Sequence, residues 1–223
     1  MKTNTPAAAP TFRLWLMMVL EFAIWGAWLP LIWGYMGAQV SDGGLGFTPA
    51  QTAWVGSAFA IASIVGIFFS SQFADRTFAA EKFMAASHLV GGLSILGMYW
   101  AKDFPTFFGL MLVHSLLYVP TISVSNSIAF THMKNAEKEF GLVRMGGTIG
   151  WILAAWPLFF LLEGKTGAAA TTAKANIFLV AGIASLLLAA YSLTLPHTPP
   201  KRAAAGEGGL AWIKAVKYLS KPF

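Results

Sequence analysis

The stretch LWLMMVLEFAIWGAWLPLIWGYMGA, at residues 14–38, contains a single charged side chain, Glu21. An α-helix rises about 1.5 Å per residue, so a helix of this length crosses the roughly 30 Å hydrocarbon core of a bilayer. The stretch therefore predicts a transmembrane helix. A charge at membrane depth costs about 2.5–3.5 kcal/mol on insertion scales, so Glu21 needs a partner, a proton or a function.

Further stretches of the chain contain no Asp, Glu, Lys or Arg and are each long enough to cross the bilayer. They lie at 53–73, 83–101, 104–131, 145–162 and 175–195. Together with the first stretch they predict an all-α membrane protein with six transmembrane helices. We expect a cytoplasmic N-terminus at 1–13, a helical bundle at 14–195, and the start of a central cytoplasmic linker at 196–223.

The composition of the 223-residue chain excludes several protein classes. Charged residues make up 11% of the chain, against about 25% in a soluble domain, and hydrophobic residues make up 57%. A disordered chain is poor in apolar residues, so disorder is excluded as well. The absence of cysteine rules out disulfides, thiol catalysis and thiolate metal sites.

The basic residues fall mainly on one side if successive helices alternate in direction. Lys102, Lys165 and Lys174 belong to the other side. The first side has Lys2, Arg13, Arg76, Lys82, Lys134, Lys138, Arg144, Lys201, Arg202, Lys214, Lys217 and Lys221. Cytoplasmic loops are enriched in Lys and Arg, so both ends of the chain are predicted to lie in the cytoplasm. The protein itself is predicted to lie in the inner membrane. Topology thus explains the net charge of +6, and nucleic-acid binding is disfavoured because the charges are spread along loops.

Glu21 is followed by Trp25 and Trp28, at i+4 and i+7 on one helical face. A carboxylate beside two indoles is typical of a binding surface, with Glu21 as a proton-coupling candidate and the tryptophans as substrate contacts. The alternative is that Glu21 is protonated or paired locally and that the tryptophans pack or sit in an interfacial belt.

A second polar stripe begins at His114 in the segment 104–131 and continues with Tyr118 at i+4. Asn126 lies beside this stripe. Pro120 removes a backbone donor there and permits a kink. His114 is predicted as a proton carrier, because histidine titrates nearest neutral pH. The alternative is a hydrogen-bonded packing histidine. His88, in the preceding segment, is isolated in the sequence and is not chosen as a site residue.

Arg144, Thr148 and Trp151 form a third stripe, again at i, i+4 and i+7. A cation, a hydroxyl and an aromatic ring on one face predict a second ligand surface. For Arg144 the alternative is an anchor at the membrane surface. Gly146 and Gly150 make a small-xxx-small pair, which predicts close packing against another helix.

A short internal repeat accompanies these stripes. Trp28-Leu29-Pro30 in the first predicted helix matches Tyr118-Val119-Pro120 in the fourth. Each helix begins a unit of three helices, and because three is odd the two units have inverted topology. Inverted repeats are typical of secondary transporters.

At these residues the chain resembles the nucleoside:H+ symporter family of the major facilitator superfamily. The matching elements are LEFAIWGAWL at 20–29, YVPTISVSNS at 118–127, RMGGTIGW at 144–151 and TLPH at 194–197. The resemblance implies twelve helices in two halves around a central cavity, with this chain as the first half. It also implies that Arg144, Thr148 and Trp151 line a nucleoside site, and that the missing half supplies further coupling carboxylates.

The chain also departs from its relatives. Glu21 stands where enterobacterial members of the family tend to have Gln. The loop signature of the superfamily survives only as Asp75-Arg76. We predict a cytoplasmic gate at these two residues, with an ordinary charged loop as the alternative.

Together these features predict a symporter that imports nucleosides by alternating access, driven by the proton gradient without a metal or other cofactor. Another small polar solute, such as a sugar, is the main alternative. An intramembrane enzyme is disfavoured because no serine lies in a Gly-x-Ser-Gly setting, and a haem carrier would need His88 and His114 as paired ligands. We further expect the stripes of Glu21 and Arg144 to line one water-accessible cavity.

Overall fold

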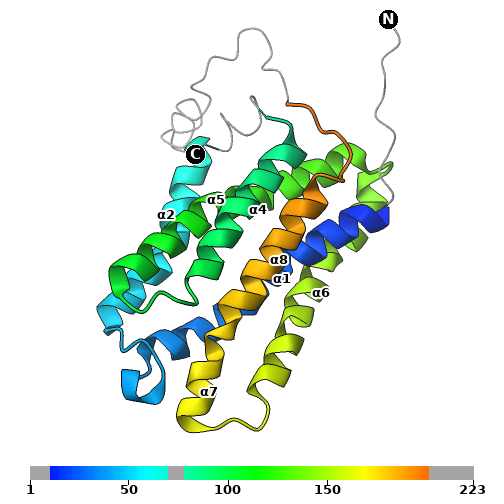
Figure 1. Ribbon diagram of the computed structural model, residues 1–223. Helices are drawn as coiled ribbons and strands as arrows, with labels where there is room; N and C mark the ends of the chain where they lie inside the picture. Colours follow the sequence, from blue (N-terminus) through cyan, green and yellow to red (C-terminus); the bar gives the residue numbers. More distant parts are fainter. Residues whose placement is uncertain (1–10, 70–77, 201–223) are drawn as a thin grey trace, which may run out of the picture.

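The computed structural model describes residues 11–69 and 78–200, and these form helices joined by short loops. The helices are α1 Thr11–Gly37, η1 Val40–Asp42, α2 Pro49–Phe69, α4 Ala80–Gly97, α5 Phe104–His132, α6 Ala136–Leu162, α7 Gly167–Lys174 and α8 Asn176–Ser192 (Figure 1). Each predicted span overlaps a helix. Asp75 and Arg76 lie outside the described residues, as does the linker beyond residue 200.

Four helical stretches among the described residues are long and apolar enough to cross a membrane. These are α1, α5, α6 and the continuous stretch Gly167–Ser192, which joins α7 to α8. The other two predicted spans correspond to α2, with 21 residues, and α4, with 18. The structure thus has the expected all-helical, multi-span character, and the number six stays a prediction.

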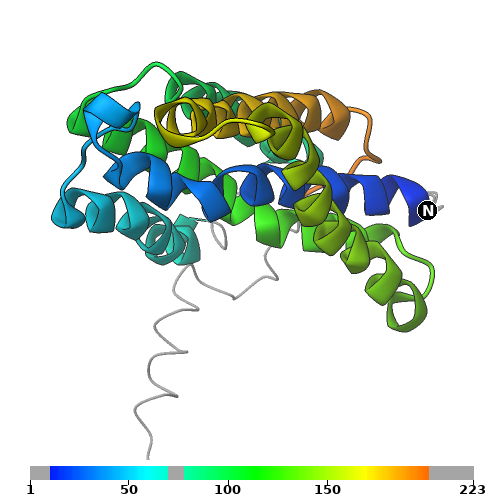
Figure 2. The same cartoon turned by 90° about the horizontal axis from the view of Figure 1, so that it is seen from below.

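Helix α1 runs through the middle of the bundle, with α8 on one side and α2 on the other (Figure 2). It packs most extensively on α6 and α8, while α4 packs on α5 and α8, and α2 packs on α5. Because neighbours surround it, α1 buries both apolar side chains such as Ile24 and the polar Glu21. The stripe of α1 that carries Glu21 therefore contacts several helices at once.

Small residues allow α1 and α6 to approach closely, as the Gly146 and Gly150 pair predicts. A methyl group at Gly150 would overlap the backbone of Val19, and one at Gly146 would lie 2.6 Å from the carbonyl oxygen of Trp15. On the other side of the contact, a Cβ atom at Gly26 of α1 would lie 2.8 Å from the backbone of Trp151. The prediction of close packing is confirmed, and this contact sets the position of the Trp151 ring.

The long helices α1, α2, α4, α5, α6 and α8 run in alternating directions between two ends of the bundle (Figure 1). At one end the Arg13 guanidinium donates to the carbonyl oxygen of Thr194, which joins the start of α1 to the segment after α8. At the other end Lys102 Nζ donates to the Tyr35 hydroxyl at 2.9 Å, which joins the end of α1 to the loop before α5. Lys102 is therefore more than a loop charge.

The segment after α8 is fastened to the ends of α4 and α5. The buried Glu81 carboxylate accepts hydrogen bonds from the Thr198 backbone amide at 2.9 Å and pairs with His197 Nδ1 at 2.8 Å. The Ala80 amide donates to the Thr198 carbonyl, and His132 Nε2 lies 2.8 Å from the Thr198 hydroxyl. These bonds fix where the chain leaves the bundle.

Candidate functional site

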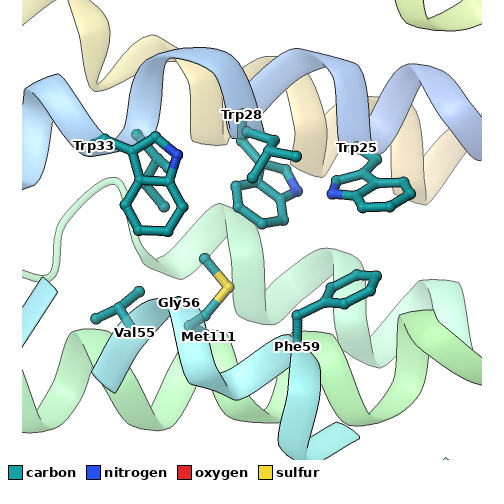
Figure 3. A pocket seen from close by; sticks show the side chains of 9 residues that line it. Trp25, Trp28, Trp33, Val55, Gly56, Phe59 and Met111 are labelled. Carbon is teal, nitrogen blue, oxygen red and sulfur yellow. The ribbon is translucent and has the colours of Figure 1, made fainter. Parts of the chain in front are cut away.

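An apolar cavity of about 170 Å³ lies between α1, α2 and α5 (Figure 3). Four of its nine lining residues are aromatic. The lining residues are Trp25, Trp28, Leu29, Ile32 and Trp33 of α1, Val55, Gly56 and Phe59 of α2, and Met111 of α5. Such a concave, apolar space with a few polar groups is the usual form of a small-molecule site.

Trp25 is held in place by aromatic rings from three other helices. It stacks on Phe59 of α2, with ring centroids 4.9 Å apart and an interplanar angle of 12°. It meets Trp151 of α6 edge-on at 5.5 Å and Tyr118 of α5 at 6.5 Å. Two residues predicted from separate stripes, Trp25 and Trp151, thus meet directly. Phe59 was missed, because nothing in the pattern of α2 distinguishes it from a lipid-facing ring.

The indole nitrogens of Trp25 and Trp28 are buried and have no hydrogen-bond partner within residues 11–69 and 78–200. Figure 3 shows the two nitrogens turned toward each other across the space between the rings. Buried indole N–H groups normally find an acceptor. Two free donors at the edge of an apolar cavity are suited to a flat ligand that carries an oxygen or nitrogen acceptor.

Glu21 is fully buried and is bound by α4 and α5. Its Oε2 atom lies 2.9 Å from His88 Nε2, and its Oε1 atom lies 2.8 Å from the Thr121 hydroxyl, which also lies 2.5 Å from the Tyr118 carbonyl oxygen. The Tyr118 hydroxyl donates to the Glu21 backbone carbonyl at 2.8 Å. The carboxylate is therefore satisfied by protein groups and does not line the aromatic cavity.

His88, which was not predicted as a site residue, is the direct partner of Glu21. Its other ring nitrogen, Nδ1, lies 3.2 Å from the hydroxyl of Ser185 on α8. Gly92 makes room for this arrangement, because a Cβ atom there would lie 2.9 Å from the Ser185 hydroxyl. Within residues 11–69 and 78–200, no group of three or more His, Asp or Glu side chains is arranged to hold a metal ion.

His114 and Tyr118, which form the second predicted stripe, lie on α5 and pack against the first stripe on α1. The His114 ring stacks on Tyr118 at 5.3 Å, meets Trp28 edge-on at 6.3 Å, and has Nδ1 3.0 Å from the Gly91 carbonyl. Because a carbonyl only accepts, Nδ1 carries a proton, and the buried Nε2 atom has no partner in the part of the chain that the structure describes. Asn126 has a buried Oδ1 atom that also lacks a partner among the described residues.

Arg144 lies close to the Glu21 region but does not face it across a cavity. Its guanidinium carbon stands 4.1 Å from the centroid of the Phe22 ring, a cation–π contact, and Gly147 leaves room for the head group. Thr148 is exposed on α6. The expectation that Glu21 and Arg144 share a water-accessible cavity is wrong, because the Glu21 side chain is fully buried, with His88 and Thr121 as its partners.

Comparison with known proteins shows that the chain is similar to transporters. The profile of the family described as Nucleoside H+ symporter matches residues 9–223. The YegT protein of Escherichia coli (strain K12) is 34% identical over 191 residues, which cover 86% of this chain and 43% of YegT. The xanthosine permease of the same strain is 33% identical over 192 residues, which cover 84% of this chain and 43% of the permease.

Among solved structures, the chain is similar to the nucleoside transporter NupG in a point-mutant form. The TM-score is 0.81 at 24% identity, over 94% of this chain and 51% of NupG. At that identity the likeness shows the fold alone. The chain spans less than half the length of the curated relatives it matches.

Proposed function

The chain belongs to the nucleoside H+ symporter family, and we propose that it forms the N-terminal half of a proton-coupled transporter that imports nucleosides. The proposal extends to a missing C-terminal half with six further helices, since the chain covers 43% of the length of its relatives. The printed name of one relative, xanthosine permease, supports a nucleoside as the substrate class.

For the fold we propose six transmembrane helices in two inverted units of three, with α1, α2 and α4 matched to α5, α6 and α8. The packing supports this pairing. Exchanging the two units turns the α1–α6 contact into the α5–α2 contact and the α1–α8 contact into the α5–α4 contact, and all four are among the larger interfaces. The bundle at 14–195 would then place 1–13 and 196–223 in the cytoplasm.

The observation that carries the substrate proposal is the packing of Trp25 at the aromatic cavity. A nucleobase has two apolar faces and an edge that carries hydrogen-bond acceptors, so it can lie against the aromatic lining of the cavity and beside the indole N–H groups of Trp25 and Trp28, which have no partner among the described residues. Trp151 and Tyr118 complete the aromatic wall behind Trp25. Base stacking on aromatic side chains is worth about 1–3 kcal/mol per base.

Polar contacts to the substrate are proposed for three further residues. The exposed Thr148 and partly exposed Arg144 on α6 would meet ribose or base groups that face the second half. Asn126 offers its unpartnered Oδ1 as an acceptor. Alternating access would follow from rocking of the two halves about this midplane site, with Asp75 and Arg76 at the cytoplasmic gate and with Glu21 and His114 as the proton-coupling candidates.

A solute panel tests the function. The full-length protein that contains this chain is reconstituted in liposomes with an inward proton gradient, and uptake of labelled nucleosides, free nucleobases and sugars is compared. We expect nucleosides to accumulate and a protonophore to abolish the accumulation. Uptake of a sugar in preference to every nucleoside, or nucleoside accumulation that survives the protonophore, would reject the proposal.

A further inference from the structure

The hydrogen bonds around His88 fix how many protons the Glu21–His88 pair holds. The Ser185 hydroxyl donates to the His88 backbone carbonyl at 2.9 Å, so its only proton is used there. The Ser185 oxygen, 3.2 Å from His88 Nδ1, must then accept, and Nδ1 carries a proton. On the other side, the 2.9 Å contact between His88 Nε2 and Glu21 Oε2 also requires a proton between the two atoms.

The pair in this arrangement is therefore net neutral. It is either an imidazolium beside a carboxylate or a neutral imidazole beside a carboxylic acid, and the two forms differ only in where one proton sits. Removing that proton leaves a lone pair on Nε2 facing a carboxylate oxygen at 2.9 Å, and a net negative charge in a fully buried site. Both consequences are costly in a low-dielectric interior.

Loss of the proton thus favours rearrangement at a junction of four helices. Glu21 belongs to α1, His88 to α4, Thr121 to α5 and Ser185 to α8. The pair can relax if α1 and α4 separate and water enters. It can also relax if His88 changes tautomer, but Ser185 must then release the His88 carbonyl. In either case the bonds that hold α4 against α1 and α8 change.

The surroundings connect this junction to the aromatic cavity. Glu21 and Trp25 are one turn apart on α1, about 6 Å along the axis, and Tyr118 touches both, by its hydroxyl and by its ring. The other ionisable groups near the pair are Tyr118 and His114 on α5, and Arg144 on α6, which lies over Phe22. On α8 the facing group is the neutral Ser185.

We propose that Glu21 and His88 together bind one coupling proton, with His88 Nε2 as the exchanging atom and Glu21 as its counter-charge. This inference rests on the proposed transport function and adds a proton site inside the N-terminal half. On loading, a proton from water forms an N–H bond at Nε2, and on release the same bond breaks and the proton returns to water. No other covalent bond is made or broken.

Transport assays separate proton coupling from substrate passage. Accumulation driven by a proton gradient requires proton movement, whereas exchange of labelled for unlabelled nucleoside without a gradient does not. In the full-length protein, Glu21→Gln and His88→Gln should each reduce accumulation to the level of the concentration gradient while exchange continues. His197→Gln, at the exposed end of the bundle, is the matched histidine control and should leave both assays unchanged. Accumulation by Glu21→Gln and His88→Gln at the wild-type level would overturn the inference.

A second measurement does not depend on transport. Nitrogen NMR of the protein labelled with 15N-histidine, assigned with His88→Gln, reports protonation of each ring nitrogen as pH is varied. We expect a proton on His88 Nδ1 throughout and a titrating proton shared between Nε2 and Glu21, with the titration altered in Glu21→Gln. A His88 ring that stays neutral and carries its proton on Nε2 at every pH would overturn the proton site. If the wild-type protein neither exchanges nor accumulates nucleosides, the proposed function fails, and this spectrum still decides the inference.

Discussion

Trp25 of α1 and Trp151 of α6 meet edge-on, with ring centroids 5.5 Å apart and an interplanar angle of 75°. The contact depends on glycines, because Gly26 faces the Trp151 backbone and Gly150 faces Val19, which lets α1 and α6 approach closely. Backbone packing thus sets the aromatic wall of the cavity. A substitution where α1 crosses α6 should therefore change the shape of the cavity, although the substituted residue does not line it.

Gly150→Ala should destabilise the protein and weaken substrate binding. The added methyl group overlaps the Val19 backbone, and overpacking of this kind typically costs about 1–3 kcal/mol. Gly141→Ala on the same helix is the matched control, because nothing lies within 4 Å of its added methyl group. Thermal unfolding in detergent measures both variants, and equal melting temperatures for the two would contradict the close-packing account.

Arg144→Ala should weaken nucleoside binding far more than Lys138→Ala, which removes an exposed charge from the same helix. Arg144 is held over the Phe22 ring, so its guanidinium is positioned rather than free in solvent. Arg144→Lys should recover only part of the affinity, since an ammonium cannot reproduce the planar, multi-donor group. Equilibrium binding of a labelled nucleoside tests this, and matching losses for Arg144→Ala and Lys138→Ala would make Arg144 a surface anchor.

Glu81→Ala should release the segment that follows α8. The change removes the acceptor of the Thr198 amide and the partner of His197, and the buried amide is then left unsatisfied at a cost of about 1–3 kcal/mol. Hydrogen exchange should become faster at the amides of Thr198 and Ala80. Glu137→Ala, an exposed carboxylate in the first turn of α6, is the control, and no difference in exchange between the two variants would argue against this anchor.

The helical periodicity of the sequence predicted which residues of α1 lie together at the cavity. An i, i+4, i+7 spacing places residues on one face whatever the neighbours are, and Trp25 and Trp28 do line one cavity. The pair Gly146 and Gly150 predicted the close contact with α1, because only small residues permit it. Each of these patterns can be recognised within a single segment of the sequence, without knowledge of the neighbouring helices.

The partner of Glu21 was not predicted, although the sequence held a usable signal. Glu21, His88 and His114 are the only Asp, Glu, Lys, Arg or His residues in the six predicted spans. Ionisable residues at membrane depth tend to pair with one another, so a search for pairs between spans would have tested His88. Which histidine pairs with Glu21 depends on how α4 packs beside α1 and α8, and periodicity within one helix does not determine that packing.

Trp25→Leu tests the central claim, that the aromatic wall around Trp25 recognises the base of a nucleoside. The measurement is the half-saturating concentration for uptake of a labelled nucleoside by the full-length protein in liposomes with an inward proton gradient. Trp100→Leu, which changes a strongly exposed indole outside the cavity, is the control. Loss of about 1–3 kcal/mol of stacking predicts a rise of about 5- to 150-fold for Trp25→Leu and none for Trp100→Leu. An unchanged half-saturating concentration in Trp25→Leu would contradict the account.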